Sequence, residues 1–142
     1  MSCIFCKIIK GETQASFTYR DEICSAFMDI HPVNPGHVLI VPNQHFESVD
    51  QLPEATGAKM FSVAQKIYKA LIESDVRMDG ANIFLSNGEA AGQEVPHCHI
   101  HIVLRFLGDG QRVGFKHAGA ASRGALDDIA NKLSNHLGNL LP

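Results

Sequence analysis

The sequence predicts an α+β fold in which a five-stranded, mostly antiparallel sheet carries two helices. Short runs rich in apolar and β-branched residues are bounded by turn residues, and two longer segments repeat apolar residues at helical spacing. The elements follow the order strands, helix, strands, helix, which differs from the strict alternation of a doubly wound fold. A length of 142 residues suits one domain, so we expect a single domain over residues 1–142.

The first three strands are expected in the N-terminal third of the chain. Residues 17–20 and 23–28 are apolar runs around Asp21-Glu22 and predict a hairpin with a tight turn. Residues 29–36 contain two prolines, an asparagine and a glycine, which indicate a loop. Residues 37–41 are dense in aliphatic side chains and predict a central strand.

The rest of the chain predicts two helices, two strands and two loops. A long helix is expected over residues 53–74, because proline is tolerated in a first turn and apolar residues follow at helical spacing. Strands are expected at 81–85 and 99–104, with loops at 86–92 and 108–119 and a second helix at 122–137. The apolar stripe of the first helix comprises Met60, Phe61, Ala64, Ile67, Tyr68 and Leu71, and we interpret it as core.

Composition excludes several classes of partner. The formal net charge is −3 and no Lys or Arg run exceeds two residues, so the basic footprint of a duplex nucleic acid binder is absent. No stretch of about 18 apolar residues predicts a membrane span. The first residues lack the layout of a secretory signal, so we expect a cytoplasmic protein. Its four cysteines, Cys3, Cys6, Cys24 and Cys98, are then expected as reduced thiols.

The densest chemical signal is a row of alternating histidines, His97, His99 and His101. On a strand these three share one face, about 6.6 Å apart, while Cys98 and Ile100 face the core. Neutral imidazole is a nucleophile near pH 7, and its N–H groups donate to phosphate oxygens. The row therefore favours phosphoryl-type transfer. Surface or structural histidines, and a catalytic zinc site completed by further ligands, are the alternatives.

Two other patterns accompany the histidine row. The preceding segment contains Asn87-Gly88 and Gly92-Gln93, where backbone N–H groups and an amide are available to a phosphate, although an ordinary loop has the same composition. Near the N-terminus, Cys3-x-x-Cys6 is compatible with a redox pair, with half of a tetrahedral zinc site, or with two inert thiols. The absence of a preceding strand argues against a thioredoxin-like role.

Three segments together resemble the histidine triad superfamily and its Hint-like branch. The run Gly92-Gln93-Glu94-Val95-Pro96-His97-Cys98-His99-Ile100-His101-Ile102-Val103 is similar to the triad signature. Residues 27–45, which include Asp29, Gly36, His37 and His45, are similar to the other shared segment, and residues 3–12 to the start of many members. The matches extend from Cys3 to Arg105. The resemblance implies homodimers in which the two sheets join and the long helix is buried.

The resemblance also implies an activity and a site. It implies hydrolysis or transfer at the α-phosphate of a purine nucleoside phosphoramidate or related conjugate, without a catalytic cofactor. His99 would form a nucleotidyl-histidine, His101 would hydrogen-bond the phosphate or ribose, and His97 and His37 would orient His99. Asp29 would bind the ribose, although a local turn with Pro32 would also explain it. The implied nucleotide-binding residues are Phe5, Ile8, Asp29, Ile30, Asn87, Gln93, Glu94 and Val95.

Some relatives hold a structural zinc, and the matching ligands would be Cys3, Cys6, His45 and His97. Two departures concern the leaving group: Glu94 stands where a serine is frequent, and the chain has no Trp. The alternatives are a dinucleoside polyphosphate hydrolase of the same superfamily and a nucleotide-sensing adaptor with incidental turnover. A galactose-phosphate type nucleotidyltransferase is disfavoured, because its motif ends in His-Pro-His-Gln.

Overall fold

The computed structural model describes residues 2–138. The chain divides into two compact units, Met1–Asp109 and Gly110–Pro142, and each is described by itself. The first contains the sheet, two α-helices and every candidate site residue. The expectation of one domain over the whole chain stays a prediction.

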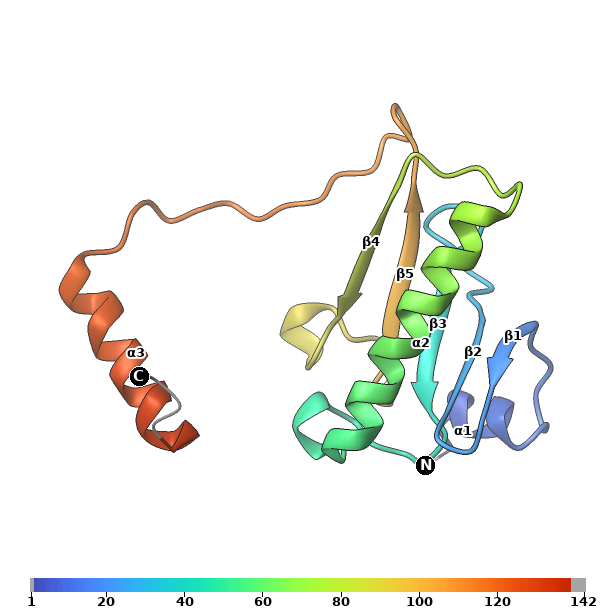
Figure 1. The fold of residues 1–142 in the computed structure, drawn as a ribbon, viewed down its shortest axis with the longest axis horizontal. Helices are drawn as coiled ribbons and strands as arrows, with labels where there is room; N and C mark the ends of the chain where they lie inside the picture. The colour runs from blue at the N-terminus through green and yellow to red at the C-terminus, as the bar shows by residue number, and fades with distance from the viewer. Residues whose placement is uncertain (1, 139–142) are drawn as a thin grey trace. The chain divides into compact units, whose positions relative to one another are not determined.

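The first unit is built on a five-stranded antiparallel sheet, as the sequence predicted (Figure 1). Every pairing is antiparallel and the strand order is β1-β2-β3-β5-β4. Asp21 Oδ1 accepts hydrogen bonds from the backbone N–H groups of Ile23 and Cys24, which closes the predicted β1–β2 turn. The strands are β1 Phe17–Arg20, β2 Cys24–Met28, β3 Val38–Pro42, β4 Gly80–Leu85 and β5 Ile100–Arg105.

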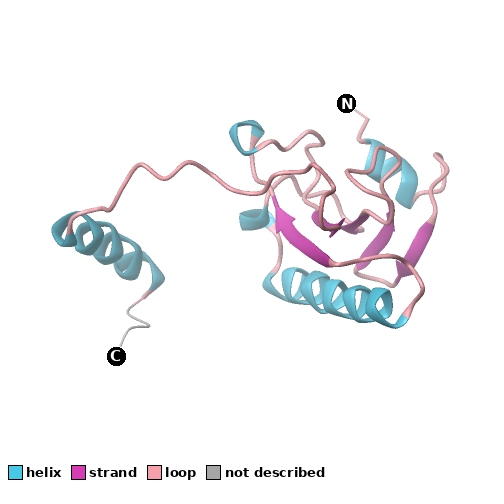
Figure 2. Cartoon of the chain, turned by 90° about the horizontal axis from the view of Figure 1, so that it is seen from above, coloured by secondary structure: helices cyan, strands magenta, loops and turns pink. Residues whose placement is uncertain are grey.

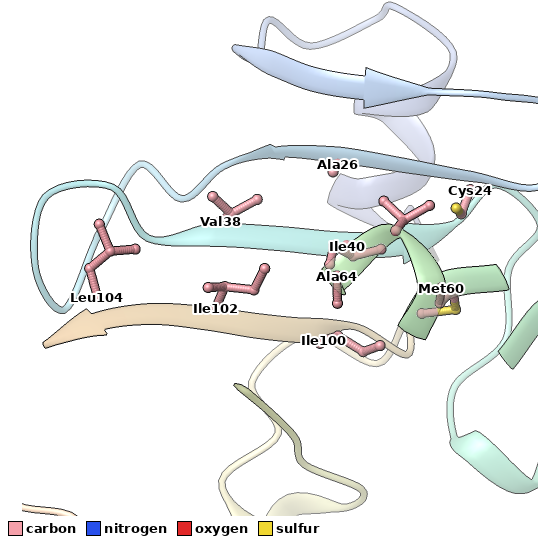
Figure 3. Close-up of a cluster of buried hydrophobic side chains, with 10 residues drawn as sticks. Cys24, Ala26, Val38, Ile40, Met60, Ala64, Ile100, Ile102 and Leu104 are labelled. Carbon is pink, nitrogen blue, oxygen red and sulfur yellow. The ribbon is translucent and has the colours of Figure 1, made fainter. Parts of the chain in front are cut away.

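The two faces of the sheet have different partners. One face packs against the long helix α2, Glu54–Glu73, through a core drawn in Figure 3. The other face packs against the short helix α1, Ile4–Ile9, whose Phe5 and Ile8 contact Phe27 and Leu39. Figure 2 shows the two helices on opposite sides of the sheet. Since β5 alternates, Ile100 and Ile102 join the α2 core and His101 faces the α1 side.

The prediction of only two helices was wrong, because α1 is a third. Its six residues are too few for a clear period, but Phe5 and Ile8 are spaced i, i+3 and both are buried. Gly11 follows with a φ of 79°, and its N–H donates to Ile8 O. That pattern is a helix C-terminal signal.

Helix α2 confirms the predicted long helix, but its apolar stripe is not all core. Met60, Val63 and Ala64 are fully buried against the sheet. Phe61 was predicted to be core, yet 54% of its surface is exposed. One residue advances the helix by about 100°, so a side chain adjacent to Met60 leaves the buried face. Ile72, 60% exposed, lies on this same outer side, eleven residues from Phe61.

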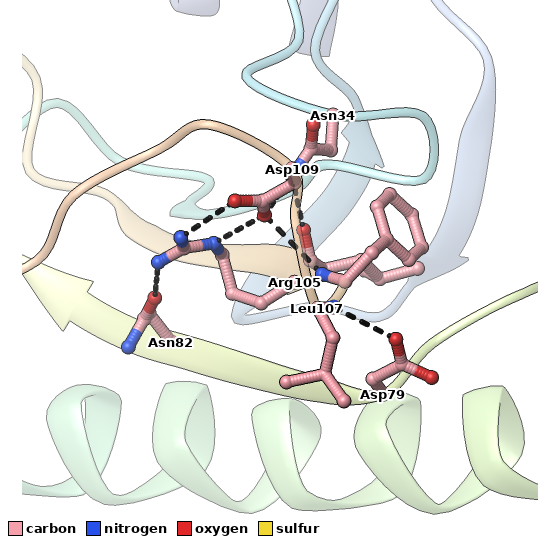
Figure 4. A network of polar contacts seen from close by, with 8 residues as sticks. Asn34, Asp79, Asn82, Arg105, Leu107 and Asp109 are labelled. Carbon is pink, nitrogen blue, oxygen red and sulfur yellow. Dashed lines mark hydrogen bonds and ion pairs between the residues drawn. The ribbon is translucent and has the colours of Figure 1, made fainter.

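A polar network anchors the loop between β2 and β3 to the end of β5 (Figure 4). Arg105 makes a bidentate ion pair with Asp109 and also donates to Asn82 Oδ1. Asn34 Nδ2 donates to Asp109 Oδ2 at 2.9 Å and to Leu104 O at 2.8 Å. Because Asn34 belongs to the loop that carries Asp29, these contacts restrain one wall of the candidate site.

The second unit consists of an extended segment and helix α3, Arg123–Leu137. Ser122 caps the helix by accepting from Ala125 N, and Gly138 ends it in the left-handed conformation. Leu126, Ile129 and Leu133 form the predicted apolar stripe and are exposed. Over residues 2–138, no helix is long and apolar enough to cross a membrane.

Gly36 is a position where only glycine fits, and its substitution should weaken the fold. Its φ is +94°, and an added Cβ would lie 2.6 Å from Cδ2 of the fully buried Leu104. We expect Gly36→Ala to lower the free energy of unfolding by about 2–4 kcal/mol, measured by urea denaturation. Gly11→Ala is the control, because its φ is +79° with nothing within 4 Å. It should cost about 1–2 kcal/mol, and equal losses would contradict the steric argument.

Candidate active site

A cavity of about 530 Å³ opens on the α1 side of the sheet. Its wall contains three of the four predicted catalytic histidines, His37, His99 and His101. A volume of this size is typical of small-molecule sites. The predicted nucleotide-binding residues that also line it are Phe5, Ile8, Asp29, Ile30, Glu94 and Val95.

The ring of His99 is held in a defined tautomer. Its Nδ1 lies 2.7 Å from the carbonyl oxygen of His97. A carbonyl can only accept, so Nδ1 carries the proton and Nε2 keeps its lone pair. Phe5 packs edge-on against the ring, with the two ring centroids 5.1 Å apart. The arrangement presents a neutral imidazole with an unprotonated nitrogen at the cavity.

His37 and His101 are joined in a chain of hydrogen bonds in which each donor can be assigned. The backbone N–H of Val33 donates to His37 Nδ1 at 3.1 Å, so the proton of His37 lies on Nε2. This Nε2–H donates to His101 Nδ1 at 2.9 Å. His101 therefore carries its own proton on Nε2. His37 thus contacts His101, which in turn contacts the His99 ring, and the predicted role of His37 in orienting His99 stays a prediction.

Burial keeps these rings neutral near pH 7. It lowers the pKa of His37 and of His99 below the ordinary value, because a charged ring loses water inside the site. Burial, with the repulsion of neighbouring His99 and His37, lowers the pKa of His101 to about 4. Neutral rings leave one nitrogen of each imidazole to donate and one to accept, as the hydrogen-bond chains require.

Phe84 was not among the predicted site residues, yet it lines the cavity and stacks on His101. The ring centroids are 4.5 Å apart and the planes are inclined by only 9°. In the β4–β5 ladder Phe84 is the direct partner of His101. An aromatic residue in the neighbouring predicted strand was the available signal, but the register that pairs the two is not encoded locally.

Asp29 takes part in a local turn and also lines the cavity. Its Oδ1 accepts from the backbone N–H of His31 at 2.9 Å, as the turn alternative anticipated. Its Oδ2 lies 3.6 Å from His37 Nε2, and the residue lines the cavity. Ile30 also lines the cavity, but 81% of its surface is exposed. The carboxylate therefore has one oxygen engaged by its own turn and one beside the histidine chain.

The two amide residues predicted near the phosphate have other contacts. Gln93 Oε1 accepts from Gly88 N, and its Nε2 donates to Glu47 O and Val95 O. It lines a neighbouring cavity of about 760 Å³. Asn87 Oδ1 accepts from Val49 N and lines neither cavity. Backbone groups therefore engage both ends of the Gln93 amide and the Oδ1 of Asn87.

His97 does not point into the histidine cavity with the other two members of the row. It lies in a bend before β5 begins at Ile100, so strand alternation does not apply to it. Its Nε2 lies 2.9 Å from Pro42 O and must donate, which leaves Nδ1 unprotonated. That Nδ1 faces Cys3, Cys6 and His45.

A cluster with the geometry of a tetrahedral metal site is formed by Cys3, Cys6, His45 and His97. Their ligand atoms all lie within 4.8 Å of one another. The His97 Nδ1 to His45 Nδ1 distance is 3.2 Å, and the nitrogen to sulfur distances are 3.4 to 3.6 Å. A tetrahedral zinc ion separates two nitrogens by about 3.3 Å and a nitrogen and a sulfur by about 3.5 Å. The donor set and its spacing therefore fit zinc.

Comparison with known proteins places the chain in a family. The HIT domain profile matches residues 10–107, and the chain belongs to the HIT family. It is similar to an uncharacterised HIT-like protein of Methanocaldococcus jannaschii, at 41% identity over 92% of this chain and 98% of the relative. It is also similar to the adenosine 5′-monophosphoramidase of Schizosaccharomyces pombe, at 34% identity over 72% and 74% of the two chains.

Solved structures agree with the fold. A HIT family protein of Bacillus anthracis superimposes with a TM-score of 0.86 at 36% identity, covering 95% of this chain and 96% of the other. A zinc-bound histidine triad family protein of Mycobacterium smegmatis gives a TM-score of 0.73 at 36% identity, over 93% and 98%. The resemblance inferred from the sequence motifs is confirmed.

The hydrogen-bond chain predicts how stability depends on pH. The pKa of His101 is about 4 in the folded chain, below its ordinary value of 6.5. Between these values the unfolded chain binds a proton that the folded chain does not, so protonation favours unfolding. We expect an NMR titration of His101, assigned with His101→Gln, to have its midpoint near 4. The free energy of unfolding should fall as the pH drops from about 6.5 to about 4. A midpoint near 6.5 would contradict this burial argument.

Proposed function

We propose that this protein is a hydrolase or transferase that acts at the α-phosphate of purine nucleoside 5′-phosphoramidates or related nucleotide conjugates. The observation that carries the proposal is His99, whose Nδ1–H is fixed on the His97 carbonyl while Nε2 remains unprotonated. The ring lines a nucleotide-sized cavity beside His101. Relatives named adenosine 5′-monophosphoramidase and adenylylsulfatase support this class of substrate.

The reaction then proceeds in two displacements. His99 Nε2 attacks the α-phosphorus, the bond from phosphorus to the leaving nitrogen breaks, and the amine departs with a proton taken from water. In the second step, water attacks the nucleotidyl-histidine, the phosphorus–nitrogen bond to His99 breaks, and a proton returns to solvent. His101 Nε2–H stabilises the charge that develops on a phosphate oxygen. Across the two steps, two bonds to phosphorus form and two break, and the proton that the amine takes up is matched by the proton that water releases. Neither step uses a metal.

The remaining cavity residues suit a nucleoside. Phe5 and Ile8 form an apolar wall on α1, where a purine ring replaces water. The Asp29 carboxylate offers an acceptor to the ribose hydroxyls. Because Phe5 also contacts His99, the base wall and the nucleophile share one packing unit.

Removing the nucleophile should abolish turnover. We expect His99→Ala to lower the rate of AMP release from adenosine 5′-phosphoramidate by about 10⁴-fold or more. His117→Ala, which removes an exposed histidine of the second unit, should match the wild type. EDTA should have no immediate effect on the chemical step. If His99→Ala retains most of the activity, the nucleotidyl-histidine scheme is wrong; faster turnover of diadenosine polyphosphates would instead reassign the substrate.

We also propose that Cys3, Cys6, His45 and His97 hold a structural zinc ion, as their spacing and donor atoms fit. When bound, the ion clamps the ring of His97, whose backbone carbonyl orients His99. Elemental analysis of protein purified without chelator should find one zinc per chain. Cys3→Ser should lose it, whereas Cys24→Ala, which changes a buried thiol elsewhere, should keep it. Wild-type protein without zinc would reject the site.

A homodimer through the outer side of α2 is a further part of the proposal. Phe61 and Ile72 expose 54% and 60% of their surfaces there, and β4 is an edge strand of the sheet. Exposed apolar surface and an open sheet edge are each typical of an interface. We expect Phe61→Glu to shift the protein from dimer to monomer in analytical ultracentrifugation. Phe115→Glu alters an equally apolar exposed residue outside α2 and should leave the dimer intact; a monomeric wild type would contradict this interface.

A further inference from the structure

We propose that Phe84 is a positioning residue for phosphoryl transfer: its ring, stacked flat on His101, fixes the plane in which His101 Nε2–H points at the phosphate. This inference rests on the proposed function, since it concerns how that same site aims its hydrogen-bond donor. Phe84 lies in β4, directly opposite His101 in the β4–β5 ladder. It belongs to the wall of the cavity that contains His99.

The geometry around His101 leaves one face for this restraint. His37 and His99 contact the ring with their planes tilted by 45° and 56°. Only Phe84, among the described ring contacts, lies parallel to it, at 9° and 4.5 Å. A ring stacked parallel at this distance blocks tipping toward it, because tipping would bring ring atoms into overlap, whereas the tilted rings of His37 and His99 do not lie along the plane of His101. Phe84 is therefore the neighbour that defines the plane of the ring.

A hydrogen bond alone does not fix that plane. His101 is tethered at Nδ1 by the N–H of His37, at 2.9 Å. One such contact leaves the His101 ring free to tip about Nδ1. Tipping then displaces Nε2, the ring nitrogen that this hydrogen bond does not hold. The flat ring of Phe84 on one face restricts tipping toward that face. Displacements of about 1 Å in a catalytic group reduce rates by as much as about 100-fold, so the restraint has a measurable value.

The stack also covers one face of a ring that must stay neutral. The described titratable groups that act on His101 are His37 just before β3, His99 just before β5 and Asp29 in the loop after β2. The first two disfavour a charged ring and Asp29 favours it, while burial is the largest cause of the lowered pKa. Phe84 adds apolar cover without adding a charge. Its loss exposes that face to water, so the pKa of His101 should move up.

The obvious alternative is that Phe84 only contacts the substrate or fills space, and variants separate these roles. Phe84→Leu keeps apolar bulk but removes the flat ring, and Phe84→Tyr keeps the ring. Ile83→Ala is the matched control, because Ile83 is the preceding β4 residue, is 39% exposed and points to the other face of the sheet. A base-contact role would raise KM, whereas a positioning role lowers kcat.

The test measures AMP release from adenosine 5′-phosphoramidate and the NMR signals of His101 in the full-length variants. We expect Phe84→Leu to lower kcat by about 10- to 100-fold with KM within about twofold, and to raise the His101 titration midpoint. Phe84→Tyr should recover kcat to within about threefold, and Ile83→Ala should leave both parameters and the titration unchanged.

Two results would overturn the inference. One is an unchanged kcat in Phe84→Leu with only KM raised; the other is a His101 titration that Phe84→Leu does not move. A wild type with no turnover on this substrate would sink the proposed function itself, and the His101 titration would still report whether Phe84 controls the ring. The failures of the two proposals are therefore distinguishable.

Discussion

The hydrogen bond from the His99 ring to the carbonyl of His97 is the contact on which the site depends. Because the carbonyl accepts only, it assigns the proton of His99 to Nδ1 and leaves a lone pair on Nε2. The bond spans two residues at the start of β5, where the chain bends before the ladder begins. The start of β5 therefore holds the proposed nucleophile in place, and burial, which lowers the pKa of His99, favours the neutral ring.

His97 connects this nucleophile to the cysteine cluster. Its backbone holds His99, its Nε2 is fixed on Pro42 O, and its Nδ1 faces the Cys3 and Cys6 sulfurs. One residue thus has three fixed points, on β3, on the cysteine cluster and on His99. A zinc ion held by Cys3, Cys6, His45 and His97, as proposed, would fix the Nδ1 side of an imidazole whose Nε2 already donates to Pro42 O. The proposed zinc site would thus link the N-terminal cysteines, which lie outside the cavity, to the position of His99.

Much of the fold followed from local patterns. The strand boundaries lie within one residue of those predicted, because short apolar runs were bounded by turn residues such as Asp21. Alternation also placed Ile100 in the core and His101 on the opposite face. Helix α1 was not predicted, because six residues are too few to show a helical period. Phe61 was assigned to the core because the apolar stripe of α2 was taken as one position too wide.

The site was less predictable where contacts are distant. His97 was predicted to share one face of a strand with His99 and His101. Because β5 starts three residues after His97, strand alternation does not apply to it. Gln93 and Asn87 were expected around the phosphate, partly through backbone N–H groups, and that role stays a prediction. In the structure the Gln93 amide and Asn87 Oδ1 bond to backbone groups of nearby loops. Phe84 is 17 positions from His101 in sequence and meets it only through the β4–β5 register. The spacing of a motif predicts which residues come together at the site. Tertiary contacts decide which of their atoms face the cavity.

The most direct measurement is the tautomer of His99, read from long-range ¹⁵N–¹H NMR correlations of labelled protein at pH 7. The structure predicts a neutral ring with its proton on Nδ1 and an unprotonated Nε2. Neither the imidazolium nor the Nε2–H tautomer has a lone pair on the attacking nitrogen. Observing either as the major form would contradict the central claim that the His97 carbonyl prepares His99 for attack on phosphorus.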